Sequence, residues 1–368
     1  MSLSKIVALA VYVAAVAAQA PTETYPATPL ASKGPYTYPS GIPYKVDTDT
    51  HLIRGVQHGY NICNSTTAGQ DSLCQTMHVN SVDDFCLWGP PEMGREVGDI
   101  EGIMVAWCTQ PRHGTRLIPA EALHGVQFMK TPDYAQVVGF IDQTKINILA
   151  GDYGGEMDPH GADLRGNPMG GLVFSNQFTG SPIQAIEWHN FMGNNGFCIK
   201  VCDPNGPDAA NFCEHKLDRI GCAYNAPNNA RNGTFESCEG ESQDFPGIHT
   251  NAAGVTTSYN QPAGPITSIS YTARVPASSN CRQFESTSIY SALPTLTPTG
   301  VTTTSTTSGR VVTSAPTSRP ATTGNAPGSG SGSTPTPTPG AGNTGGASAL
   351  SISFGAVAAS VFAALFFA

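Results

Sequence analysis

Short runs of β-branched and aromatic residues dominate the hydrophobic pattern of the middle of the chain, and Gly, Pro, Asn or Asp interrupts them. This pattern is typical of β-strands. The runs that predict strands are residues 100–108, 125–130, 135–142, 145–150, 171–178, 183–191, 197–201 and 265–275. Many short strands at close spacing predict a mainly β single domain, folded as a disulfide-stapled sandwich or jelly roll.

One segment has the period of a helix instead. Within residues 207–220, five apolar positions recur at helical spacing, and Gly221 follows as a stop. We therefore expect one short helix there, clamped by Cys213 and Cys222.

The apolar pattern changes character at the start of the chain. Lys5 precedes an uninterrupted small and apolar run, residues 6–18, which is the layout of a secretory signal peptide. The run is shorter than the ~20 residues of a membrane span, which disfavours an uncleaved anchor. Cleavage after Ala18 is favoured, because the competing site after Ala20 would leave Pro21 first. Residues 19–34 then form an N-terminal extension.

The end of the chain carries a second export signal. Residues 354–368 are apolar to the last residue, and small residues precede them. Small residues, a spacer and an apolar tail are the order of a glycosylphosphatidylinositol (GPI) signal. We expect attachment at Asn343, or at Gly342 or Gly345, with residues 344–368 removed. A single-pass helix and a secreted chain without an anchor are the alternatives.

Residues 286–347 differ from both neighbours in composition. They consist almost entirely of Thr, Ser, Pro, Ala and Gly, and only Arg310 and Arg319 are charged. Such a segment buries too little apolar surface to offset the entropy of ordering it. It predicts a disordered, O-glycosylated stalk, or a bare linker if the sugars are absent.

All ten cysteines fall in the remaining residues, 35–285. An even number in an exported chain predicts five disulfides. Zinc is the alternative for the later group, but the spacing there lacks paired C-x-x-C units. Spacing leaves the connectivity open, although the early and late groups favour local pairing. The cysteines are Cys63, Cys74, Cys86, Cys108, Cys198, Cys202, Cys213, Cys222, Cys238 and Cys281.

Charge and glycosylation signals limit the classes of partner that the domain can bind. Residues 35–285 keep 26 of the 27 acidic residues and 14 of the 18 basic ones, a net charge of about −12. That charge disfavours nucleic acid or an anionic membrane surface as a partner. Sequons at Asn64 and Asn232 predict two N-glycosylation sites on the surface.

The best candidate for chemistry is the Gly-rich acidic loop of residues 151–163, which also holds His160. Its carboxylates are candidate Ca²⁺ ligands, and Asp158 and Asp163 are weak candidates for an acid and base acting on a glycan. A structural role is favoured, because Asp-Pro and Gly-Gly form turns and Asp caps its own loop. The calcium candidates are Asp152, Glu156, Asp158 and Asp163.

Glu187 and His189 form a second weak catalytic candidate. On a strand they share one face while Trp188 points to the other. A pair without catalytic function is favoured. A carboxylate separation of about 5 to 10 Å between Glu187 and Asp158 or Asp163 would favour a glycosidase. The three tryptophans, Trp88, Trp107 and Trp188, offer a sugar-stacking platform or, as the favoured alternative, core packing.

Several sequence segments resemble those of a known family. They include residues 59–66 (GYNICNST), 83–88 (DDFCLW), 140–145 (FIDQTK), 187–193 (EWHNFMG), 219–225 (RIGCAYN) and 276–281 (PASSNC). The domain resembles the basidiomycete macrophage-activating glycoprotein family, which is similar to fungal immunoreactive mannoproteins. The resemblance implies a surface mannoprotein whose glycans host mannose-binding lectins recognise. It implies no catalytic residue.

Together these observations predict a GPI-anchored fungal cell-surface or cell-wall glycoprotein with a non-catalytic ectodomain and no cofactor. Wall polysaccharide is the candidate partner on the fungal side. The alternative is a carbohydrate-binding or carbohydrate-active domain that uses residues 152–163 and Glu187, with Ca²⁺ as its candidate cofactor.

Overall fold

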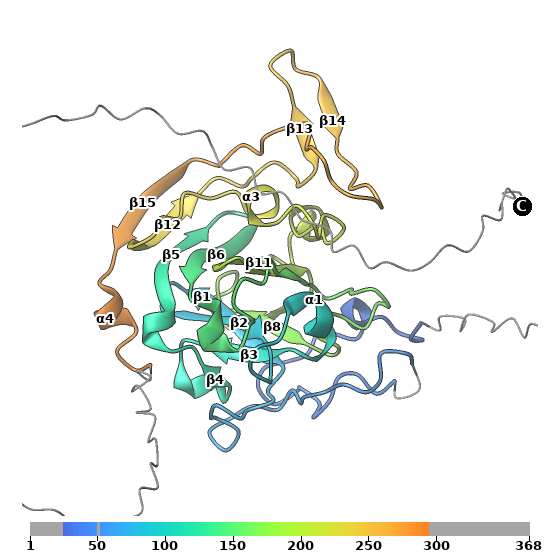
Figure 1. The fold of residues 1–368 in the computed structure, drawn as a ribbon, viewed down its shortest axis with the longest axis vertical. Helices are drawn as coiled ribbons and strands as arrows, with labels where there is room; N and C mark the ends of the chain where they lie inside the picture. The colour runs from blue at the N-terminus through green and yellow to red at the C-terminus, as the bar shows by residue number, and fades with distance from the viewer. Residues whose placement is uncertain (1–24, 50–51, 294–368) are drawn as a thin grey trace, which may run out of the picture. The chain divides into compact units, whose positions relative to one another are not determined.

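The computed structural model describes residues 25–49 and 52–293, and these form a mainly β domain, as predicted (Figure 1). Two large sheets contain six and seven strands, and β13 (Ile248–Thr250) pairs with β14 (Thr256–Ser258) in a separate hairpin. No helix in this part of the chain is long and apolar enough to cross a membrane. The predicted signal peptide, the stalk beyond residue 293 and the GPI signal lie outside the described residues.

The first sheet places two parallel pairs, β1 with β8 and β3 with β4, among antiparallel ones. Its strands, in order across the sheet, are β4 (Arg116–Leu117), β3 (Val105–Cys108), β2 (Asp84–Gly89), β1 (Thr76–Ser81), β8 (Leu172–Ser175) and β9 (Ile183–Ala185).

The sequence pattern missed β1 and β2, because polar residues are buried on them. His78 is buried, and the ring of Tyr38 packs edge-on against it at 4.9 Å. Leu30 and Val46 also pack on this side of the sheet, with Phe174 of β8. The N-terminal segment therefore covers a face that the alternation of polar and apolar residues assigns to solvent.

In the second sheet only β12 and β5 are parallel. The predicted runs 125–130, 135–142 and 197–201 are all strands here. The hydrophobic pattern did not predict β15, because this strand is exposed at every position and has no apolar face. The order is β15 (Ser278–Gln283), β12 (Phe235–Gly240), β5 (Leu123–Lys130), β6 (Tyr134–Ile141), β11 (Gly196–Cys202), β10 (Trp188–Gly193) and β7 (Gly155–Met157).

The two sheets pack face to face as a sandwich with one shared core. The rings of Trp88 on β2 and Trp188 on β10 lie 5.9 Å apart, and Asn190 of β10 accepts a hydrogen bond from the Trp88 backbone N–H at 2.9 Å. Trp107 is buried as well. The tryptophans are therefore core residues, and the sugar-platform alternative is wrong.

All ten cysteines pair, and the separations of 11 to 43 residues confirm local connectivity. Because Cys198, Cys202, Cys213 and Cys222 form two of the disulfides, the zinc alternative is wrong. The disulfides are Cys63–Cys74, Cys86–Cys108, Cys198–Cys222, Cys202–Cys213 and Cys238–Cys281.

Three predicted strands differ from the structure. Residues 145–150 begin within η5 (Gln143–Ile146), because the Asp142 side chain caps that turn and Asn147 ends it in the left-handed region. Residues 265–275 pair with no strand among the described residues, and their side chains stay largely exposed. Residues 183–191 split into β9 and β10, which belong to different sheets.

The structure also differs from the predicted strand at residues 100–108 and from the predicted helix. The run opens with the end of α1 (Val97–Ile100) and with η2 (Glu101–Ile103), and only its second half is strand. Residues 207–220 contain just one helical turn, α2 (Ala209–Phe212), before α3 (Cys222–Asn225). Cys213 and Cys222 are each bonded to β11, so they hold this segment against the sheet instead of clamping a helix.

The folded domain extends past the predicted boundary at residue 285. After α4 (Ser286–Ile289), Tyr290 is buried against Phe235, and its hydroxyl donates a hydrogen bond to the Val82 carbonyl at 2.8 Å. Leu293 is buried too. Any stalk therefore begins no earlier than residue 294.

Candidate functional site

Acidic and histidine side chains from four distant segments meet beside β7. Glu101 opens η2, Glu156 lies on β7, Asp158 and His160 follow that strand, and Glu187 lies where the chain crosses from β9 to β10. His215, after α2, completes the set. We call these six residues the carboxyl–histidine cluster. The structure thus brings the acidic loop and Glu187 together.

His160 is the centre of the cluster. Its backbone N–H donates to Asp158 Oδ1 at 2.7 Å, its ring Nε2 lies 3.0 Å from Glu187 Oε2, and its ring stacks on His215 at 3.8 Å. Burial opposes the charged form of His160, but the Glu187 hydrogen bond and charge outweigh this and raise its pKa. Burial and the nearby positive charge of His160 lower the pKa of His215. Of the two rings, His160 is therefore the one that favours the charged, doubly protonated form.

Glu156 is the most deeply placed carboxyl group of the cluster. It lies opposite Phe191 of β10, is 3% exposed, and neither of its carboxyl oxygens has a hydrogen-bond partner among the described residues. Burial, followed by the charge of Asp158, raises its pKa well above the ordinary value. Burial also raises the pKa of Asp158, although two backbone N–H groups stabilise its charged form.

Glu101 has its pKa raised to about 7, by burial first and then by the charge of Asp158. It accepts hydrogen bonds from the Glu156 backbone N–H and from Asn167 Nδ2, the latter at 2.9 Å. Sequence reasoning missed Glu101, because it lay in a run interpreted as a strand. The only local signal against a strand was a glycine at each of positions 98 and 102.

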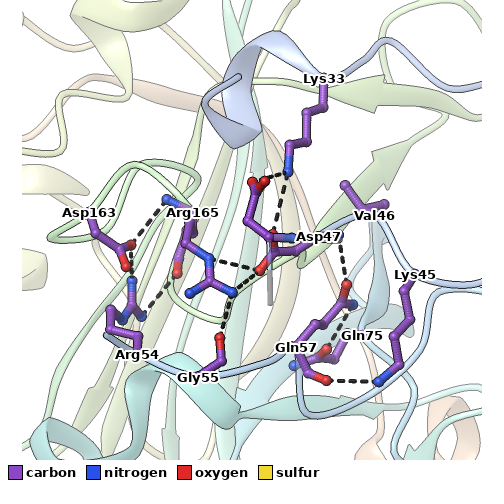
Figure 2. A network of polar contacts seen from close by, with 12 residues as sticks. Lys33, Lys45, Val46, Asp47, Arg54, Gly55, Gln57, Gln75, Asp163 and Arg165 are labelled. Atoms are coloured by element: carbon purple, nitrogen blue, oxygen red, sulfur yellow. Dashed lines mark hydrogen bonds and ion pairs between the residues drawn. The ribbon is translucent and has the colours of Figure 1, made fainter. Parts of the chain in front are cut away.

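Asp163 lies outside the carboxyl–histidine cluster, in the network that Figure 2 shows, and Arg54 links that network through Asn167 to Glu101. Its Oδ1 accepts from Arg54 Nη1 at 2.6 Å and from the Arg165 backbone N–H at 3.2 Å. The Arg165 guanidinium is buried against Asp47, and Lys33 lies 3.4 Å from the same carboxylate. Asp163 therefore helps to join the N-terminal segment to the acidic loop, which is a structural role.

The four predicted calcium ligands do not converge. Asp152 Oδ2 accepts from the Val97 backbone N–H at 2.9 Å and so caps α1, away from the bonds that Asp158 and Asp163 make. Within residues 25–49 and 52–293, the only close group of three donor side chains is Glu236 with Cys238 and Cys281, and those two cysteines form a disulfide.

Glu187 and His189 do not act as a pair. Trp188 faces the core, and His189 points to the other face of β10, where it is fully buried. Burial lowers the pKa of His189 well below its ordinary value. Glu187 precedes the strand and bonds to His160 instead. The predicted shared face is therefore wrong, because the strand begins one residue after Glu187.

The arrangement places groups with separated proton affinities side by side, as acid–base sites do. Glu101 titrates near neutral pH and Glu187 accepts from a histidine that favours the charged form. Access is narrow, however, since Glu156 and Asp158 are buried and the side chains of His160 and Glu187 are 20% and 16% exposed. A ligand would reach the His160–Glu187 edge first.

No protein-family model matches the chain, and no solved structure matches it. The chain is 42% identical over 265 residues to appressorium protein ROW2 of Mycosarcoma maydis, covering 70% of this chain and 85% of ROW2. It is 46% identical over 228 residues to appressorium protein ROW1 of the same fungus, covering 61% of this chain and 51% of ROW1. The chain thus matches about half the length of ROW1.

These relatives confirm the expected basidiomycete origin of the family, while their names refer to the appressorium and not to macrophage activation. The chain belongs to the fungal family that contains the appressorium proteins ROW1 and ROW2.

Proposed function

We propose that this protein is an exported, GPI-anchored glycoprotein of the fungal cell surface, whose disulfide-rich domain acts outside the cell without catalysing a reaction. The observation that carries the proposal is the pairing of all ten cysteines in five disulfides. Disulfides of this density form and persist in oxidising compartments.

Surface features agree with export. Asn64 and Asn232 are both exposed, as N-glycan acceptors must be. The apolar leader of residues 6–18 and the small-residue and apolar order of residues 342–368 support entry to the secretory pathway and a lipid anchor. Relatives that carry the name appressorium protein support a role at the surface of an infection structure. Wall polysaccharide and host mannose-binding lectins are the proposed partners.

A lipase-release experiment tests the anchor. An epitope-tagged full chain, expressed in a fungal host, should appear at the cell surface. Phosphatidylinositol-specific phospholipase C should release it from membranes, or β-glucanase from the wall if the chain has been transferred to glucan. The matched control is the same chain ending at Ser353, which should enter the medium. Retention inside the cell, or a membrane fraction that neither enzyme releases, would contradict the proposal.

The carboxyl–histidine cluster favours a second candidate function, glycan binding or cleavage at the His160–Glu187 edge. Its specific observation is the meeting of Asp158 and Glu187 on opposite ends of one histidine. The purified domain should be tested on fungal and plant polysaccharides, with and without Ca²⁺. Binding or sugar release that Glu187→Gln abolishes and Asp163→Asn preserves would support this function. Neither binding nor sugar release on any glycan would contradict it.

A further inference from the structure

We propose that an open groove beside Tyr44 holds the first sugars of an N-glycan carried by Asn64. The inference rests on the proposed function, because only exported chains receive N-glycans. The groove encloses about 370 Å³, between Tyr44 and Tyr60 on one side and residues 66–72 on the other. That volume lies at the small end of the ~300 to 1,000 Å³ range of small-molecule sites.

The tyrosine pair gives the groove a surface for a sugar ring. Tyr44 is 60% exposed and stacks on Tyr60 with ring centroids 5.7 Å apart and an interplanar angle of 15°. Tyr60 is fixed from below, since its hydroxyl accepts from the Leu73 backbone N–H at 3.3 Å. Tyr60 therefore supports one face of Tyr44, while the residue as a whole stays largely exposed. The negative face of an aromatic ring attracts the polarised C–H groups on one side of a pyranose.

Asn64 is hydrogen-bonded to Thr66 in one wall of the groove, so a glycan on Asn64 would start beside that wall. Its Oδ1 accepts from the Thr66 backbone N–H at 2.8 Å and from Thr66 Oγ1 at 2.7 Å, and Thr66 lines the groove. Nδ2, the atom that would carry the sugar, makes no hydrogen bond to any described residue and is left available. The Cys63–Cys74 disulfide and the Tyr60–Cys74 bridge hold the attachment point and the tyrosine pair in one rigid unit.

A tethered sugar suits this groove better than a free one. The site is open, and few polar groups on its rim are unused, because both ends of the Gln70 amide are bonded to Leu117. The exposed carboxylate of Asp71 remains to accept from sugar hydroxyls. Such a site binds weakly, but covalent attachment converts binding into an intramolecular step at millimolar effective concentration.

Asn232 is a matched internal control. It is also an exposed sequon, but among the described residues its side chain and that of Thr234 are not hydrogen-bonded to each other, and residues 231–234 do not line this groove. Its glycan should therefore project into solvent. Comparing the two sites in one molecule cancels differences in enzyme activity and preparation.

The test is the rate at which peptide-N-glycosidase F removes each glycan from the native, full-length glycoprotein, followed by mass spectrometry of the two glycopeptides. We expect release from Asn64 to be about fivefold slower than from Asn232. Tyr44→Ala should remove the difference and Tyr44→Phe should keep it, while prior reduction and denaturation should make the rates equal. Tyr44 is exposed, so neither variant threatens folding.

Equal native rates in the wild type, protection that survives Tyr44→Ala, or an empty Asn64 beside an occupied Asn232 would each overturn the inference while leaving export intact. If neither sequon carries a glycan in a fungal host, the inference fails, while the lipase-release experiment still decides the proposed function.

Discussion

The contribution of Glu101 to the stability of the domain should fall as the pH rises from about 5 to 8, because its carboxyl group holds a proton in the folded state that it releases in the unfolded state. Burial raises the pKa of Glu101 to about 7 from its ordinary 4.5. Between these values the Glu101 carboxyl group binds more protons in the folded chain than in the unfolded chain, so its contribution to the free energy of unfolding decreases with pH. The contribution is fully present below about 4.5 and is lost as the pH passes 7.

The variant Glu101→Gln isolates this effect, since a neutral amide resembles the protonated carboxyl group. One pKa unit is worth about 1.4 kcal/mol, which sets a ceiling of about 3 kcal/mol for Glu101. Because part of the residue meets solvent, we expect the variant to be more stable than the wild type by about 1 to 3 kcal/mol at pH 8, and equal to it at pH 5.

Guanidinium unfolding at pH 5, 6, 7 and 8, followed by the fluorescence of the buried tryptophans, measures the difference. Glu285→Gln, at an exposed carboxyl group, is the control and should keep the wild-type slope. The histidines of the cluster titrate in the same range with shifts of opposite direction, so the comparison between variants decides. Parallel curves for Glu101→Gln and the wild type would refute the reasoning.

Three further outcomes are expected. Burial alone would raise the pKa of Asp84, but hydrogen bonds and charges from His113, Asn80 and Arg112 lower it to about 2, so Asp84 stabilises the fold above pH 4. In urea unfolding, Asp84→Asn should lower the free energy of unfolding by about 2 kcal/mol at pH 7 and by much less at pH 2.5. Lys200 is buried and donates to three neutral oxygens, so Lys200→Met should leave those acceptors without a donor and lower the free energy of unfolding by about 2 kcal/mol; no loss would contradict the network. A domain ending at residue 285 should melt below one ending at residue 295, because it lacks buried Tyr290; equal melting temperatures would return the boundary to residue 285.

The apolar pattern predicted those strands whose neighbours agree with it. The hairpin of β5 and β6 is central and rich in β-branched residues, so local preference and tertiary packing point the same way. The apolar pattern could not predict β1, where His78 is buried under a segment some 40 residues earlier in the chain. It also could not predict β15, which contributes only backbone pairing. In both cases the deciding partner lies far away in sequence.

The same limit applies to the carboxyl–histidine cluster. The sequence indicated Asp158 and Glu187 separately, from a turn-rich acidic loop and from the alternation of a strand. Their meeting depends on a crossing between the sheets, which the continuous run of residues 183–191 conceals. Glu101 enters through a helical turn that the Asp152 carboxylate caps, so one acidic-loop residue helps to place the carboxyl group that the pattern missed.

A buried group of acidic residues that lacks full pairing is costly, so other parts of the fold must offset that cost. Here the segment that carries His215 is bonded to β11 through both Cys202–Cys213 and Cys198–Cys222. Such crosslinks restrict the unfolded chain and so offset native-state penalties of the size calculated for Glu101. Reducing these disulfides should therefore expose the cluster at pH 8 before pH 5, because the carboxyl groups repel one another most when they are ionised. Hydrogen exchange of residues 203–225 at the two pH values would detect this opening. Equal opening free energies at pH 5 and pH 8 would show that the disulfides do not offset the cost of the cluster.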